Sequence, residues 1–215
     1  MEAFRVVYLV SGLLFLAVAL LGGAWWELVL GEPAKPVLYV GLSPFGIESE
    51  LFGSQAIETP PVLNALLLAF RALAILGAST IVIGAMLEGR PWSKKLLNLR
   101  PLTMSIGFAI LVAATTMLLP RFLSTAIPQL AQLTPNLNEA FAPYSSGRLR
   151  INLYPLTRVN SSLDLAFKSQ LTLNFWIASL SGALCLAGWV LTKKRARETL
   201  GEAKPVTEEQ PPITS

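Results

Sequence analysis

The run from Pro61 to Leu87 constrains the fold of this chain more than any other stretch. It contains one charged residue, Arg71, and is otherwise apolar or small, over more than the roughly 20 residues that a helix needs to cross a bilayer. The loop that follows carries Trp92, Lys94 and Lys95. An apolar run that ends in an aromatic residue and retained cations is typical of a membrane-spanning helix. The chain is therefore expected to be an integral membrane protein.

Three further apolar runs complete the predicted topology, which has spans at about residues 5–29, 65–87, 101–119 and 171–192. Basic clusters follow the second and the fourth span, and cytoplasmic loops retain Lys and Arg. We therefore predict an all-α fold, a four-helix transmembrane bundle in the plasma membrane with both termini cytoplasmic. A cleavable signal peptide is the competing interpretation of the first run. The length of that run favours a retained helix.

The two outer loops, residues 31–60 and 121–170, carry strand patterns. Residues 37–42 alternate between two faces, and so do residues 148–154, which begin with Arg148 and Arg150. The first loop is acidic and this second stretch is basic, and opposite charges stabilise cross-strand pairs. We expect the two stretches to pair in a small extracytoplasmic β-containing cap. The fourth helix is expected to begin before the membrane, with Lys168 still outside.

Domain organisation follows from these spans. Residues 1–197 form one transmembrane domain with its outer loops, and residues 198–215 form a polar, proline-containing cytoplasmic tail that is predicted to be disordered.

Arg71 is the main candidate for a functional charge inside a span. The simplest interpretation is a side chain that extends to the interface, or a salt bridge to an outer acid such as Glu27. The alternative is a contact with a substrate or ion inside the bundle. Asn174, near the outer end of the fourth span, is expected to bond a neighbouring helix.

Other candidate residues concern contacts and topology. Trp25 and Trp26 are predicted to end the first helix at the outer interface. Ala178 and Gly182 are small residues four apart, a spacing that lets another helix approach closely. Asn160 begins the sequence Asn-Ser-Ser, which matches a glycosylation acceptor.

Composition limits the chemistry. The chain has no histidine and a single cysteine, Cys185, so an intrachain disulfide is impossible. It shows no phosphate-binding loop, nucleophile–base set or metal-ligand spacing. We predict neither catalysis, nor a cofactor, nor a metal. The net charge of +4 lies largely in clusters beside apolar runs, which indicates membrane topology rather than nucleic-acid binding.

The layout of four crossings, with a strand-bearing first outer loop and a larger second one, resembles that of claudins and tetraspanins. Claudins carry a Trp…Gly-Leu-Trp…Cys…Cys pattern in the first loop. Here Gly41-Leu42 is followed by Ser43, and both cysteines are missing. The Cys-Cys-Gly motif of tetraspanins is missing as well. The resemblance is one of layout, and it implies no functional residues.

Together these observations predict a non-enzymatic interaction, structural or accessory subunit of a membrane assembly. Its expected partners are membrane lipid and either copies of itself or other membrane subunits. The alternatives are a small transport or channel component that attracts anions through Arg71, and a non-catalytic subunit of a membrane enzyme complex.

Overall fold

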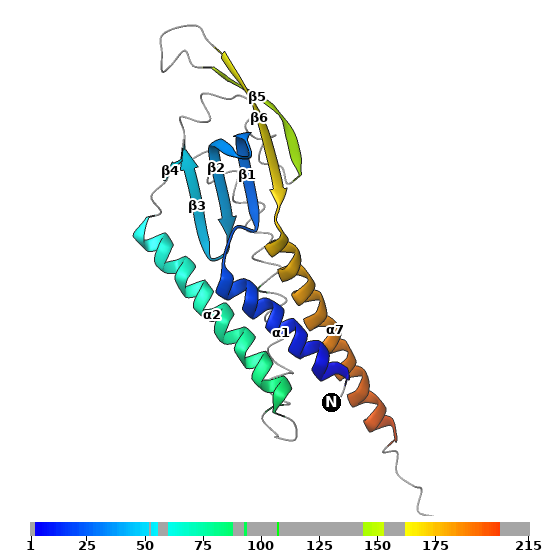
Figure 1. Ribbon diagram of the computed structural model, residues 1–215. Coiled ribbons are helices and arrows are strands. Elements are labelled where there is room, and N and C mark those ends of the chain that lie inside the picture. Colours follow the sequence, from blue (N-terminus) through cyan, green and yellow to red (C-terminus); the bar gives the residue numbers. More distant parts are fainter. Residues whose placement is uncertain are drawn as a thin grey trace, which may run out of the picture.

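A computed structural model describes residues 3–51, 53–55, 60–87, 93, 107, 144–152 and 162–202. Within these residues the protein consists of three long apolar helices and one six-stranded antiparallel sheet, which lies at one end of the helices (Figure 1). The prediction of an all-α fold is therefore wrong. The described part contains three helices rather than four, and the predicted span 101–119 lies outside the described residues, except for Gly107.

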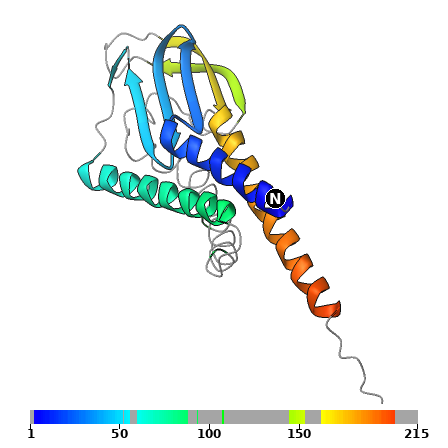
Figure 2. The ribbon, with the colours of Figure 1, turned by 60° about the horizontal axis from the view of Figure 1, so that its bottom comes forward.

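The helices are α1 (Ala3–Leu21), α2 (Pro61–Met86) and α7 (Leu173–Glu202). Each is long and apolar enough to cross a bilayer. α1 lies between α2 and α7 and packs against both. Figure 2 shows that α2 and α7 lie on either side of α1 and diverge from each other. α1 is therefore the central helix of the described bundle.

The sheet has the strand order β4-β3-β2-β1-β6-β5. The first four strands are consecutive in the chain, and the last two come from the second outer loop. Their bounds are β1 (Trp26–Glu32), β2 (Lys35–Ser43), β3 (Gly46–Leu51), β4 (Ser54–Gln55), β5 (Ser145–Asn152) and β6 (Ser162–Leu171). The central strand β1 follows α1 after four residues, so the central helix leads directly into the centre of the sheet.

The first helix is shorter than the predicted span 5–29, because it ends at Leu21. Gly22 and Gly23 follow with φ angles of 72° and 91°, which glycine adopts without the steric cost that other residues meet. Beyond them, Trp26, Leu28 and Leu30 are buried on one face of β1. The alternation of a strand was concealed by the high overall hydrophobicity of this stretch.

The two outer loops do share one sheet, but not through the expected pair of strands. The basic strand β5 pairs with β6, so that Arg148 lies opposite Ala166 and Arg150 opposite Asp164. β6 in turn pairs with β1 of the first loop, with Lys168 opposite Val29. Residues 162–171 were expected to begin the fourth helix, and that expectation is wrong.

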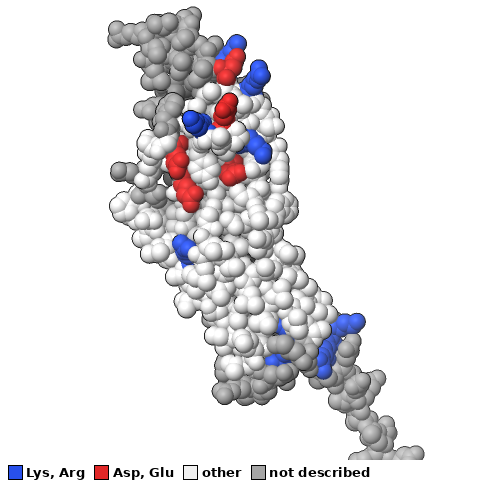
Figure 3. Space-filling model, viewed as in Figure 1, with Lys and Arg blue, Asp and Glu red and all other residues white. Residues whose placement is uncertain are grey.

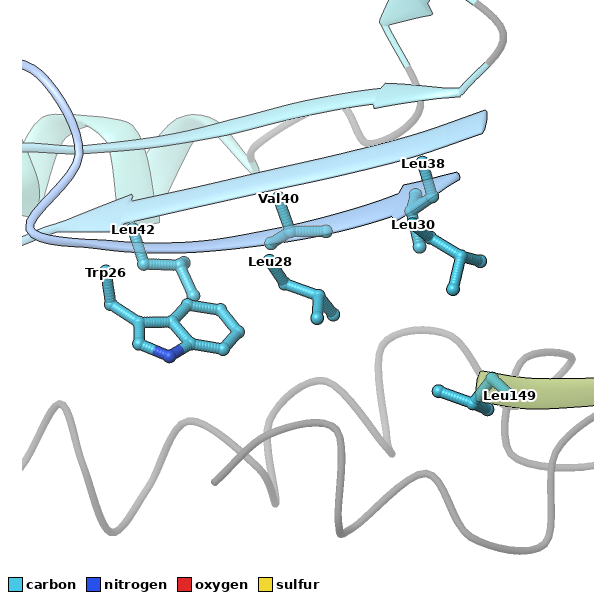
Figure 4. Close-up of a cluster of buried hydrophobic side chains, with 7 residues drawn as sticks. All are labelled: Trp26, Leu28, Leu30, Leu38, Val40, Leu42 and Leu149. Carbon is cyan, nitrogen blue, oxygen red and sulfur yellow. The ribbon is translucent and has the colours of Figure 1, made fainter. Parts of the chain in front are cut away.

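One face of the sheet forms the main hydrophobic core of the outer part. Six side chains from β1 and β2 point to the same side, and Leu149 of β5 points toward the same space (Figure 4). Burying a side chain of this size contributes about 1.5–3 kcal/mol. The cluster comprises Trp26, Leu28, Leu30, Leu38, Val40, Leu42 and Leu149. The sheet is therefore a packed structural unit rather than a minor addition to the helices.

Candidate functional site at the junction of sheet and bundle

Hydrogen bonds from α2 and from the start of α7 converge on the end of α1 and on the short link to β1. We call the junction residues 19–25, which comprise the last three residues of α1 and the link, together with the side chains that bind them, Arg71, Thr172 and Asn174. These three side chains come from α2, from the residue before α7, and from α7 itself. Elements from all three helices therefore meet at one place, just before β1 begins.

Arg71 closes the end of α1. Its Nε donates to the carbonyl oxygen of Ala19 at 2.8 Å, and its Nη2 donates to that of Leu20 at 2.6 Å. The last carbonyls of a helix have no partner within the helix, and they carry partial negative charge that a cation stabilises. The guanidinium thus satisfies two main-chain acceptors. The predicted bridge from Arg71 to Glu27 is not formed: Glu27 instead accepts a hydrogen bond from Gln170.

The start of α7 holds the same link from the other side. The Thr172 amide donates to the Trp25 carbonyl at 2.9 Å, and the Thr172 hydroxyl donates to the Ala24 carbonyl. Asn174 Nδ2 donates to the Gly22 carbonyl at 3.1 Å. A Cβ at Gly23 would lie 2.7 Å from Asn174 Nδ2, so glycine is needed there for close approach as well as for its positive φ. Asn174 therefore bonds the residue just beyond the neighbouring helix, close to what was expected.

The two tryptophans belong to this region and not to a helix end facing the interface. Trp25 is 3% exposed and meets Phe45 and Phe175 edge-on, at centroid distances of 5.7 and 6.4 Å. Trp26 lies in the sheet core, where its indole nitrogen donates to Ser169 Oγ at 2.8 Å. The prediction that both side chains end the first helix is wrong, because the chain has already left the helix at Leu21.

Below the junction, α1 and α7 are joined by a reciprocal pair of serines. The Ser11 hydroxyl donates to the Ser181 carbonyl, and the Ser181 hydroxyl donates to the Ser11 carbonyl, both at 2.8 Å. Both residues are buried. Because hydrocarbon offers no alternative partner, such polar contacts join helices within a bilayer.

Small residues allow the close packing of this bundle. A Cβ at Gly12 would lie 2.8 Å from a side-chain carbon of Val82, and one at Gly188 would lie 3.0 Å from the Tyr8 ring. Ala178 is fully buried and packs with Val18 and Trp25. Ala178 is therefore occupied inside the chain and is not available to another subunit. Gly182 is half-buried on the same helix.

The outer face of the sheet carries most of its acids on one side and most of its cations on the other. Glu27, Glu48 and Glu50 lie on β1 and β3 around Tyr39, whereas Lys168, Arg148 and Arg150 lie on β6 and β5, together with Asp164, which pairs with Arg150. Burial raises the pKa of Tyr39, and the carboxylates of Glu48, Glu27 and Glu50 raise it further. In Figure 3 charged side chains gather over the sheet and at the opposite end of the bundle, with a largely uncharged band between them.

Sequence reasoning identified Arg71, Asn174 and the outer arginines, and it missed Thr172, Tyr39 and the Ser11–Ser181 pair. The sequence does indicate the serine pair, because Ser11 and Ser181 each place a hydroxyl in an apolar span, and such hydroxyls are candidates for a contact between helices. Asn160 lies outside the described residues. Among the described residues, no group of His, Cys, Asp and Glu side chains could hold a metal ion.

Comparisons with known proteins add no family to this description. No family model matches the chain, and neither the curated proteins nor the solved structures include a match. The function is therefore argued from the junction and the sheet alone.

Proposed function

We propose that this protein is a non-enzymatic multi-pass membrane protein that presents its sheet, on a fixed bundle, to another subunit of a membrane assembly. The observation that carries the proposal is the junction. Arg71, Thr172 and Asn174 bind residues 19–25 from two sides. A sheet held by all three helices keeps its orientation relative to the membrane, which suits a surface that docks a partner.

The outer side chains of the helices suit a bilayer. α2 exposes large apolar residues on several sides, among them Val62, Leu68 and Leu73 at 83%, 66% and 64%. In water such exposure would be unfavourable, whereas in hydrocarbon it costs nothing. Membrane lipid is therefore the first partner of this surface.

For the orientation we propose that the sheet is extracytoplasmic and that both termini are cytoplasmic, in the plasma membrane. Lys193, Lys194 and Arg195 lie near the end of α7 that is remote from the sheet, and cations concentrate on the cytoplasmic side. α2 also ends far from the sheet, whereas β5 belongs to it. The predicted span 101–119 falls between these two elements in the sequence and lies outside the described residues, except for Gly107.

In the transport alternative, Arg71 attracts an anion. In the described structure its Nε and Nη2 both donate to carbonyl oxygens of α1, which supports a structural role. A small channel component and a non-catalytic enzyme subunit are the alternatives, and the experiment below separates the first of them from the proposal.

A photo-crosslinking amino acid placed in intact cells tests the proposal. It would replace Glu50 or Lys168, which are exposed on the outer face of the sheet, and, as a matched control, Leu13, which is 49% exposed on α1. We expect the two sheet positions to label the same protein and Leu13 to label mainly lipid. Labelling of no protein from the sheet, together with an anion flux in liposomes that Arg71→Met abolishes without unfolding, would contradict the proposal and favour transport.

A further inference from the structure

The edge strand β5 differs from the other edge of the sheet in length and in charge. β5 is eight residues long and pairs, within the described sheet, with β6 alone. The opposite edge consists of β4, which has two residues, and the part of β3 that β4 does not cover. An edge strand presents main-chain N–H and C=O groups that can accept a further strand. β5 offers the longer row of such groups.

The side chains of β5 leave its main chain accessible. Ser146, Gly147 and Arg148 are exposed, and exposure of a glycine is exposure of main chain. The Phe167 ring covers the other side of this position, where a Cβ at Gly147 would lie 3.0 Å from a ring carbon. β5 is thus supported from β6 and accessible along its middle.

The charges of β5 decide which strand would fit. Arg148 and Arg150 alternate along the strand and project from the outer face of the sheet, while Leu149 between them is 5% exposed in the core. Arg150 contacts Asp164 at 3.2 Å, but both side chains remain more than half exposed. An exposed ion pair of this kind contributes at most about 1 kcal/mol, so the guanidinium can exchange this partner for another.

A second copy of β5 fits poorly. The antiparallel registers that pair nearly the whole strand with itself are centred on Arg148 or Leu149. They place Arg148 opposite Arg148 or opposite Arg150, and like charges directly opposite each other are destabilising. A strand with carboxylates at alternate positions instead places opposite charges beside Arg148 and Arg150.

From these observations we infer that β5 is a docking strand, to which a partner protein adds an extended acidic segment as a seventh strand. The inference rests on the proposed function, because it names the site and the partner chemistry of the same outer sheet. Main-chain hydrogen bonds supply the affinity, and the alternating arginines supply the selection. The partner's carboxylates lie beside Arg148 and Arg150 on the outer face, and its intervening side chains extend the core beside Leu149.

Binding of a synthetic peptide to the full chain in lipid nanodiscs tests the inference. The probe is a fluorescent seven-residue peptide with glutamate at alternate positions and valine between. Two control peptides keep the length, one with lysine in place of glutamate and one N-methylated at every residue. The second control keeps every charge but has no main-chain N–H with which to form a ladder on either edge.

We expect the acidic peptide to bind and to protect amide hydrogens of β5 from exchange. R148E/R150E is expected to weaken binding at least tenfold. K168E makes the same kind of charge change on β6, away from the edge, and is expected to change binding less than twofold. N-methylation is expected to cost at least tenfold.

Equal binding of the N-methylated peptide would overturn the inference, because it would show attraction by charge alone. Absence of peptide binding to the folded protein would overturn it too. Neither result would affect the proposed function if Glu50 and Lys168 still crosslinked one protein in cells. Conversely, peptide binding without any cellular crosslink would leave β5 a docking strand and remove the support for a subunit role.

Discussion

Replacement of Arg71 by methionine tests the junction directly, because it removes two hydrogen bonds while keeping much of the side-chain stem. The bonds are those from Nε to the Ala19 carbonyl and from Nη2 to the Leu20 carbonyl, at 2.8 and 2.6 Å. Arg71→Met leaves both acceptors at the end of α1 without this donor. The C-terminal end of α1 then loses the side-chain hydrogen bonds that join it to α2.

The expected magnitude can be bracketed. A hydrogen bond to a charged group contributes about 1.5–3 kcal/mol in net terms, whereas hydrogen bonds between membrane helices average about 0.6 kcal/mol. The Arg71 side chain is only partly buried, so water at the interface can replace part of the loss. We expect Arg71→Met to lower the free energy of unfolding by about 1–3 kcal/mol.

The measurement is unfolding by a denaturing detergent in mixed micelles, followed by tryptophan fluorescence, to which the junction residue Trp25 contributes. Thr80→Val is the matched control on the same helix, because the Thr80 hydroxyl bonds only the Leu76 carbonyl of its own helix. Arg71→Lys keeps the charge with a different donor geometry and is expected to fall between the two. If Arg71→Met were no less stable than Thr80→Val, the junction would not depend on this side chain.

Three further outcomes follow from the packing and charge of the described residues. Ser11→Ala and Ser181→Ala should each lower the free energy of unfolding by about 0.6–1.7 kcal/mol in the same assay, and the two losses should add, because each hydroxyl donates to a main-chain carbonyl that the other substitution leaves in place. Gly12→Leu should destabilise the bundle by about 1–3 kcal/mol through overpacking against α2. Tyr39 should titrate above its usual pKa, as followed by NMR of labelled tyrosine, and Glu48→Gln should lower that pKa.

Each of these outcomes has a control or a contrary result. Unchanged stability of both serine variants would mean that these two hydrogen bonds contribute nothing to the bundle. Gly46→Ala should be nearly neutral, since a Cβ there would meet only Ser43 Oγ at 4.0 Å. Because the folded protein holds the Tyr39 proton more tightly than the unfolded chain, its contribution to stability is present below pH 10 and is lost as the pH rises further. Stability that increased above pH 10 would contradict this sign.

The sequence predicted the helices better than the strands, and the reason lies in what each pattern requires. α2 was recognisable because length and apolarity alone identify a span. β1 was assigned to the first helix because Trp26–Leu30, apart from Glu27, is apolar and directly continues an apolar run. Gly22 and Gly23 were the local signal for a break. β6 was assigned to the fourth helix, although Leu165, Phe167 and Ser169 alternate with exposed residues.

The junction could be predicted only in part. Arg71 was singled out, and extension of its side chain to the interface was inferred, because it is the one charge in its apolar run. The hydrogen-bond acceptors of Arg71 could not be predicted, because main-chain carbonyls carry no residue-specific signal in a sequence. The same holds for Thr172 and Asn174, whose acceptors lie about 150 residues earlier in the chain. Sequence patterns report periodicity and composition, whereas these contacts depend on how distant segments meet.

The central position of β1 has a consequence for biogenesis. β1 emerges early in translation, yet one of its two neighbours, β6, is synthesised some 140 residues later. Until β6 has been synthesised, β1 lacks one of its two neighbours, and the Trp26 indole nitrogen lacks the Ser169 hydroxyl to which it donates a hydrogen bond. The sheet can therefore be completed only after the ribosome has delivered the segment that precedes the last described helix.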